Sequence, residues 1–139
     1  MGARLVLIAR DEARGKATLA AIEKKNPHAG HTIHYADISL LAEMKRVGAE
    51  IAAAEPRIDI LINNAGGAHG LDPVATFKDA DMEAMMQSNV LGVLRMTRAC
   101  LPLMTPNPGS MIINIGSIAG IVGSAGQANY SAAKAGLIG

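Results

Sequence analysis

The stretch IDILINNAGG, residues 58–67, runs an apolar segment directly into a polar turn that contains two glycines. A short apolar run that ends at such a turn predicts a strand over residues 58–62. Runs of the same kind cover residues 5–9 and 111–115, and a shorter, more polar stretch at 32–36 is also predicted to form a strand. The run at 5–9, Leu-Val-Leu-Ile-Ala, is continuously apolar, which is typical of a strand that is buried on both faces.

Helical patterns separate these strands. A charged, alanine-rich stretch begins at Asp11, and Asn26-Pro27 ends it. Ser39 is predicted to cap the next helix, whose apolar residues recur at helical spacing until Pro56 closes it. The third helix carries a stripe of methionines and other apolar residues that is predicted to pack in the core. The predicted helices cover residues 11–25, 39–56, 81–104 and the chain from about 127 onward.

Strands and helices alternate along the chain with short connections. This order predicts right-handed βαβ units, in which helices cover a parallel sheet. The fold class is therefore α/β, a doubly wound parallel sheet of three layers, and residues 1–139 are expected to form one partial domain.

The composition argues against several classes of protein. The net charge is +1 and the charged residues are spread along the chain, which does not favour nucleic-acid binding. No apolar run reaches the roughly 18 residues that a membrane span needs. Cys100 is the single cysteine, which excludes an intramolecular disulfide, agrees with a cytoplasmic location, and predicts a small apolar residue on a buried helix face. The four histidines lack neighbouring carboxylates, so no metal site is predicted.

Polar residues follow each of the four predicted strands: Arg10, Asp37, residues 63–66 and Ser117. In open parallel α/β sheets, ligands bind beyond the carboxyl ends of the strands, so four such placements predict a binding site. Simpler interpretations exist for two of them. Ser117 could be a helix cap or turn residue, and residues 63–66 could form only a polar turn.

Tyr130 and Lys134 are four residues apart on a predicted helix and therefore share one face of it. A cation held near a phenol favours the ionised form, and such a tyrosine can give a proton to a carbonyl oxygen or take it back. Asn89 lies among apolar neighbours in the middle of a helix, where its amide needs a hydrogen-bond partner. A structural buried hydrogen bond would also satisfy that amide.

Together these residues resemble the classical short-chain dehydrogenase/reductase family, which implies a Rossmann-like fold. The resemblance covers nearly the whole chain, and it is carried by Asp37-Ile38, Asn63-Asn64-Ala65-Gly66, Asn89, Ser117 and Tyr130-Ser131-Ala132-Ala133-Lys134. Residues 112–117 and 126–139 are most similar to 3-oxoacyl-[acyl-carrier-protein] reductases. Residues 96–98 and 101–102 also resemble 3-hydroxy acid dehydrogenases.

The resemblance implies catalytic roles for four residues. Tyr130 is expected to act as the acid/base, and Ser117 to orient the carbonyl group of the substrate. Lys134 is expected to favour the ionised form of Tyr130 and to hold the nicotinamide ribose. Asn89 is expected to support a water molecule that relays protons.

The resemblance also implies a nicotinamide cofactor. Asp37 and the backbone of Ile38 are expected to meet the adenine, and Asn63 to Gly66, Ala65 included, to line the ribose side. Arg10 resembles the residue that meets the 2′-phosphate in members that prefer NADP, so NADP is the first choice and NAD the second. The alternative gives weight to Asp11, as a ribose acceptor or simply as a helix cap.

Two features of the family are not found in the chain. No Gly-x-x-x-Gly-x-Gly turn precedes Arg4, and few residues follow Lys134. In the strand order 3-2-1-4-5-6, the strand expected between the runs at 5–9 and 58–62 is missing, so the other strands must either close the gap or leave backbone groups unpaired. The 139-residue chain is therefore expected to bind NADP poorly and to show little turnover.

The function expected of the parent protein is NADP-dependent carbonyl reduction or alcohol oxidation on a small-molecule or acyl-carrier substrate. The resemblance implies a homo-oligomer, a tetramer or a dimer. The alternative is a non-catalytic, Rossmann-type nucleotide-binding or scaffold fragment, because a fold does not by itself fix a function.

Overall fold

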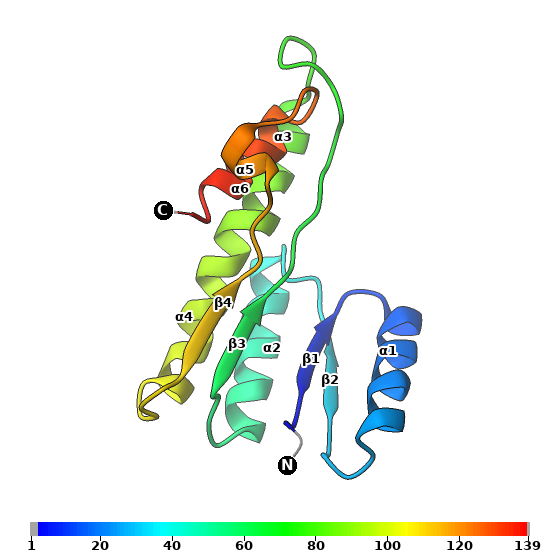
Figure 1. Cartoon of the computed structure of the whole chain (residues 1–139), viewed down its shortest axis with the longest axis vertical. Helices are drawn as coiled ribbons and strands as arrows, with labels where there is room; N and C mark the ends of the chain where they lie inside the picture. Colours follow the sequence, from blue (N-terminus) through cyan, green and yellow to red (C-terminus); the bar gives the residue numbers. More distant parts are fainter. Residues whose placement is uncertain (1–2, 139) are drawn as a thin grey trace. The chain divides into compact units, whose positions relative to one another are not determined.

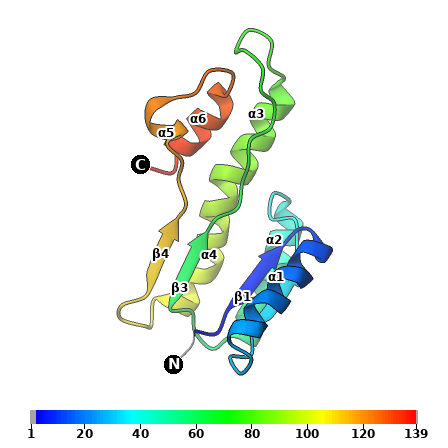
Figure 2. The ribbon, with the colours of Figure 1, turned by 45° about the vertical axis from the view of Figure 1, so that its right-hand side comes forward.

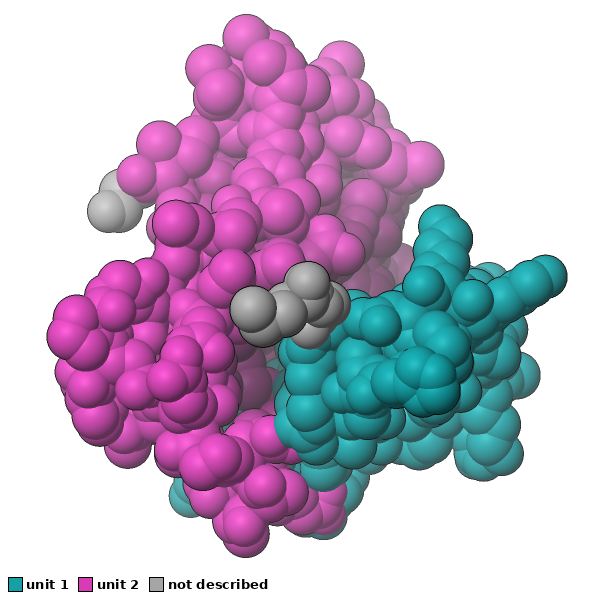
Figure 3. All heavy atoms as spheres, turned by 60° about the horizontal axis from the view of Figure 1, so that its bottom comes forward, with its two compact units in different colours: residues 1–47 teal, residues 48–139 magenta. Residues whose placement is uncertain are grey.

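The computed structural model describes residues 3–138 and contains four strands joined by helices (Figure 1). The chain divides into two compact units, residues 1–47 and 48–139, which are coloured separately in Figure 3. Its elements are β1 (Val6–Ala9), α1 (Glu12–Lys25), β2 (Thr32–Tyr35), α2 (Leu41–Ala54), β3 (Ile60–Asn63), α3 (Asp79–Met86), the π-helical turn η1 (Gln87–Leu91), α4 (Gly92–Met104), β4 (Met111–Asn114), α5 (Ala119–Val122) and α6 (Ala128–Ala135).

In the first unit, β1 and β2 pair in parallel, with Val6 opposite Thr32 and Ala9 opposite Tyr35. Helix α1 packs closely on both strands at Gly15, where a Cβ atom would lie 2.8 Å from a side-chain atom of Ile33. The expectation that β1 is buried on both faces is wrong, because every residue of β1 is only half-buried. The strand belongs to a two-stranded ladder, which leaves more of each strand uncovered than a wide sheet does.

The second unit pairs β3 with β4 in parallel, from Ile60 opposite Met111 to Asn63 opposite Asn114. Figures 1 and 2 show these strands side by side with α4 running along them, and α6 lying beside α3. The helix expected over residues 81–104 is a continuous helical rod of α3, η1 and α4. The π turn in its middle was not predicted.

One face of this rod provides the core of the second unit. The prediction that Cys100 lies on a buried helix face is confirmed, since it is 4% exposed. The prediction for the methionines holds only in part. Met85 is fully buried, whereas Met82 and Met86 are 41% and 39% exposed. These two lie outside the buried stripe, which consists of Met85, Asn89, Val93, Met96, Cys100 and Met104.

The four strands form two separate ladders, β1 with β2 and β3 with β4, among the residues that the structure describes. All pairing is parallel, as the sequence predicts.

Two local expectations need correction. Ser39 does not cap α2, because the helix begins at Leu41 and the Ser39 hydroxyl donates to Asp37. Serine can bond to nearby polar groups in a turn, which explains why Ser39 precedes the helix. The last helix does not continue along the chain, because α6 ends at Ala135 and a turn follows to residue 138.

Candidate active site

In the first unit, two residues follow β1: Arg10, an exposed cation, and Asp11, a helix cap. The Asp11 carboxylate accepts a hydrogen bond of 2.7 Å from the backbone N–H of Arg14 and caps α1. Arg10 is exposed at the carboxyl end of β1. Of the two alternatives for Asp11, the helix cap is the one observed, and both Asp11 and Arg10 are exposed to solvent at this strand end.

Asp37, which follows β2, is held by Ser39. Its Oδ1 accepts from the Ser39 hydroxyl at 2.6 Å and from the Ser39 backbone N–H at 3.0 Å. The bond from the hydroxyl lowers the pKa of the Asp37 carboxyl, and the charge of Arg10 adds a smaller effect in the same direction. Asp37 is therefore a fixed, ionised acceptor near neutral pH, and the adjacent Ile38 is half-buried.

In the second unit, the side chain of Asn63 connects two strands and a helix. This buried amide donates to Asn114 Oδ1 at 2.9 Å and to Thr97 Oγ1 at 3.1 Å. Asn63 and Asn114 are the last residues of β3 and β4, and Thr97 lies on α4. Both amide N–H groups of Asn63 are thus used within the protein, and they hold the ends of β3 and β4 to α4.

The chain turns after β3 at Ala65 and Gly66. Gly66 has φ +113°, and a Cβ atom built there would lie 2.2 Å from Asn89 Oδ1. A side chain at this position would therefore clash as well as strain the backbone. The residues 63–66 thus form more than a polar turn, because the backbone at Gly66 passes directly over a buried asparagine.

That asparagine, Asn89, is fully buried in the π turn η1. Its Nδ2 lies 3.1 Å from each of two backbone carbonyl oxygens, those of Gly67 and Met85. Its Oδ1 has no hydrogen-bond partner although it is buried. π turns inside helices are frequent at functional sites, and an unsatisfied buried acceptor needs a water molecule or a ligand to explain it.

Ser117 follows β4 and is half-buried. Its Oγ accepts a hydrogen bond of 3.3 Å from the backbone N–H of Ala119, where α5 begins. This bond places Ser117 in a turn, which agrees with the turn interpretation. The hydroxyl still has a proton to donate and a second lone pair, so the turn role and a role toward a ligand are compatible.

Tyr130 and Lys134 lie on α6, as the spacing predicts. Lys134 is only 4% exposed, and its Nζ lies 5.8 Å from the centroid of the Tyr130 ring. The ammonium donates a hydrogen bond of 3.1 Å to the carbonyl oxygen of Ile115, two residues before Ser117. This bond connects α6 to the segment that carries Ser117, and Tyr130 remains half-buried.

The close packing of α5 on α6 supports this arrangement. A Cβ atom at Gly120 would lie 2.7 Å from the carbonyl carbon of Lys134. Only a glycine permits such a close approach between the backbones of two helices. The segment that follows Ser117 is thereby held against the helix that carries Tyr130 and Lys134.

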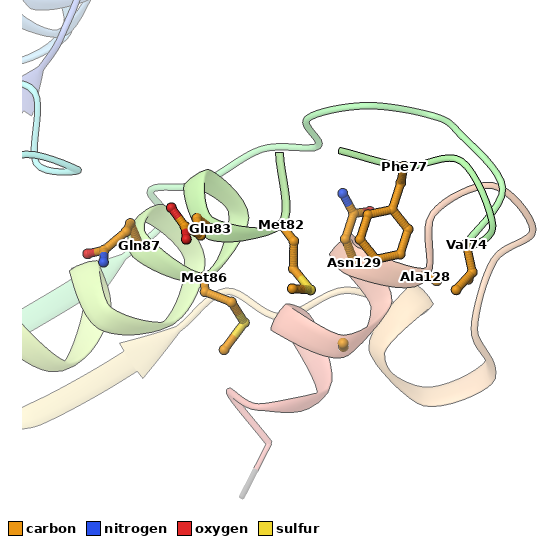
Figure 4. Close-up of a pocket in the computed structure, with 9 residues that line it drawn as sticks. Val74, Phe77, Met82, Glu83, Met86, Gln87, Ala128 and Asn129 are labelled. Carbon is orange, nitrogen blue, oxygen red and sulfur yellow. The ribbon is translucent and has the colours of Figure 1, made fainter. Parts of the chain in front are cut away.

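Sequence reasoning missed a buried polar residue next to Tyr130. Asn129 is 8% exposed, and its amide donates to the carbonyl oxygen of His69 at 2.8 Å. It also helps to line a pocket of about 670 Å³ between α3, α6 and the loop before α3 (Figure 4). The pocket is mostly apolar, with Val74, Phe77, Met82, Glu83, Met86, Gln87, Ala128, Asn129 and Ala132 around it. The one available signal was an asparagine in the first turn of a predicted helix.

Residues 3–138 contain no group of three or more His, Cys, Asp or Glu side chains that could hold a metal ion. The same residues contain no helix with the length and apolar character needed to cross a lipid bilayer.

Sequence comparisons with known proteins point to one family. The chain matches the sequence model of the short chain dehydrogenases over residues 1–139. It is 38% identical over 111 residues to a 3-oxoacyl-[acyl-carrier-protein] reductase of Vibrio harveyi, covering 79% of this chain and 43% of that protein. The chain spans about two-fifths of the length of the curated relatives it matches.

Solved structures give the same result. Levodione reductase is 29% identical with a TM-score of 0.92, and the match covers 99% of this chain and 53% of that one. A metagenomic short-chain oxidoreductase, solved in complex with NADP, is 35% identical with a TM-score of 0.84, and the match covers 99% of this chain and 61% of that one. The parallel α/β arrangement is therefore part of a known Rossmann-type fold.

Proposed function

Since the chain belongs to the short-chain dehydrogenase family, we propose that it carries the proton-transfer residues of an NADP-dependent oxidoreductase. The reaction is the reduction of a carbonyl group or the reverse oxidation of an alcohol. The observation that carries this proposal is the buried ammonium of Lys134, held 5.8 Å from the centre of the Tyr130 ring.

The second unit fits the nicotinamide end of such a cofactor. Asn89 Oδ1 is buried without a partner, and Gly66 leaves the backbone bare at the point where it passes Asn89. Lys134 uses one hydrogen bond to the Ile115 carbonyl, and an ammonium has further N–H groups that can reach a ribose hydroxyl. When bound, the nicotinamide supplies or accepts the hydride.

The chain's own residues handle the proton. Tyr130 Oη gives a proton to the carbonyl oxygen during reduction and removes it from the alcohol during oxidation. The positive charge of Lys134 stabilises the negative charge that develops on the phenolic oxygen. The Ser117 hydroxyl donates to the same carbonyl oxygen and orients it, while its own oxygen still accepts from Ala119.

The first unit supports NADP over NAD. Asp11 uses one carboxylate oxygen as a helix cap, and the neighbouring Arg10 is an exposed cation that can pair with a 2′-phosphate. Asp37, fixed by Ser39, is proposed to accept from the amino group of adenine, next to the backbone of Ile38. A similar protein was solved with NADP, which points in the same direction.

The proposed substrate is a 3-oxoacyl group on a carrier or a related small-molecule ketone. Its support is the similarity to the reductase of Vibrio harveyi. No second activity is favoured by a feature of the site.

The test is a fluorescence titration of NADPH and NADH into two proteins. One is the 139-residue chain, and the other is a completed chain, in which flanking segments of the Vibrio harveyi relative are added on both sides. We expect the completed chain to bind NADPH more tightly than NADH and to reduce a 3-oxoacyl thioester, and Tyr130→Phe to abolish turnover. If neither protein binds either nucleotide, the oxidoreductase proposal fails and a scaffold role takes its place.

A further inference from the structure

We propose that Asn129 is a positioning residue that fixes Tyr130 by clamping the first turn of α6 to the segment 67–71. The proposal rests on the proposed function, in which Tyr130 transfers the proton. It assigns a role to a residue that touches neither substrate nor cofactor and acts through its neighbour.

The two ends of the Asn129 amide hold two different parts of the chain. Nδ2 donates to the carbonyl oxygen of His69 at 2.8 Å, across 60 residues of sequence. Oδ1 accepts from the backbone N–H of Tyr130 at 2.8 Å. That N–H lies in the first turn of α6, where helical N–H groups have no partner within the helix. One side chain therefore satisfies the start of the helix and attaches it to a loop.

Close backbone packing occurs at the same place. Gly126 has φ +72°, and a Cβ atom there would lie 3.1 Å from the carbonyl oxygen of Leu71. The turn before α6 thus lies directly against the segment that Asn129 holds. Asn129 is also nine-tenths buried, so water competes little with these hydrogen bonds.

A second asparagine holds the same segment from another helical element. Asn89, in η1, donates to the carbonyl oxygen of Gly67, two residues before His69. The segment after β3 is consequently fixed at carbonyls 67 and 69 by two buried amides. Since residues 63–66 of the same loop are proposed to line the cofactor, this double clamp connects the cofactor side of the site to Tyr130.

The consequence concerns the chemical step more than cofactor binding. Releasing the Asn129 clamp leaves Asn89, Lys134 and Gly66 in place, but it allows the first turn of α6 to shift. A displacement of about 1 Å at a reacting group can cost up to about a hundredfold in rate. We therefore expect kcat to fall while KM for NADPH changes little.

Two variants separate the two ends of the amide. Asn129→Asp keeps an oxygen that accepts from the Tyr130 N–H but cannot donate to the His69 carbonyl. Asn129→Ala loses both bonds. The matched control is His69→Ala, which removes the exposed imidazole and keeps the backbone carbonyl that Asn129 contacts.

Hydrogen exchange on the 139-residue chain tests the clamp without any activity. We expect the Ser131 amide, which donates to the carbonyl oxygen of Gln127 in the clamped first turn, to exchange faster in both Asn129 variants, and the Tyr130 amide to exchange faster only in Asn129→Ala. His69→Ala should behave like the unaltered chain. Unchanged exchange at Ser131 in Asn129→Asp would overturn the proposal.

Steady-state kinetics on the completed chain test the positioning role. We expect Asn129→Asp to lower kcat by about tenfold or more, with KM for NADPH within about twofold. Faster exchange with an unchanged kcat also overturns the proposal, because Asn129 would then be structural only. The proposed function itself is tested by a different variant. It fails if Tyr130→Phe retains turnover.

Discussion

Replacing Gly66 with alanine tests the most crowded point of the candidate site. The backbone at Gly66 has φ +113°, a conformation that residues with a side chain rarely adopt. The added Cβ would lie 2.2 Å from Oδ1 and 2.6 Å from Cγ of Asn89. Both distances are far below van der Waals contact, so Asn89 has to move.

The cost follows from these two effects. A residue held in an unfavourable region of φ costs about 1–3 kcal/mol. Moving Asn89 breaks the bonds from its amide to the carbonyls of Gly67 and Met85, and a buried group left unsatisfied costs about 1–3 kcal/mol. We therefore expect Gly66→Ala to lower the free energy of unfolding by about 2–6 kcal/mol, a large part of the 5–15 kcal/mol typical of a domain.

The measurement is urea-induced unfolding, followed by circular dichroism. The matched control is Gly67→Ala, because a Cβ at Gly67 meets nothing within 4 Å. A double-mutant cycle with Asn89→Ala isolates the clash: in that background only the backbone strain of about 1–3 kcal/mol should remain. If Gly66→Ala is as stable as Gly67→Ala, the geometry around Asn89 is not as described here.

Three further results are expected. Ser39→Ala should destabilise the chain at about pH 7 and much less at about pH 2: the pKa of Asp37 is lowered below its ordinary value of 3.8, so the stabilisation exists above that value and is lost as pH falls through the folded pKa. Burial raises the pKa of Cys100 above 9.0, so iodoacetamide at about pH 8 should modify it slowly in the folded chain and fast in urea, and equal rates would contradict its burial. Gly120→Ala should cost about 1–3 kcal/mol in urea unfolding by separating α5 from α6, whereas Gly116→Ala, with no atom within 4 Å, should cost less than about 0.5 kcal/mol.

Local patterns predicted the elements of the fold well. Strands β1, β3 and β4 lie in the apolar runs predicted for them, and β2 lies in the more polar stretch at 32–36, because short runs bounded by turn residues favour strands over helices. The spacing of Tyr130 and Lys134 placed both on one helix, where the structure has them. These features depend on residues that are close together in the sequence.

Features that depend on distant residues were not predicted. Met82 and Met86 share a helix with Met85, and nothing local indicates which of its faces will be buried. The π turn around Asn89 reflects hydrogen bonds that favour one extra residue in the helix, and propensities do not encode this. The bond from Asn129 to His69 spans 60 residues, so only the folded chain brings its two ends together.

The asparagines and the lysine of the candidate site differ in what they can still offer a ligand. The donors of Asn63 are both used, on Asn114 and Thr97, and the donor of Asn129 is used on His69. These donors hold the site in shape. Asn89 retains an unsatisfied acceptor, and Lys134 has further N–H groups besides the one that binds Ile115. In the proposed site, a water molecule or hydroxyl group would donate to the Asn89 oxygen, and a ribose oxygen would accept from Lys134.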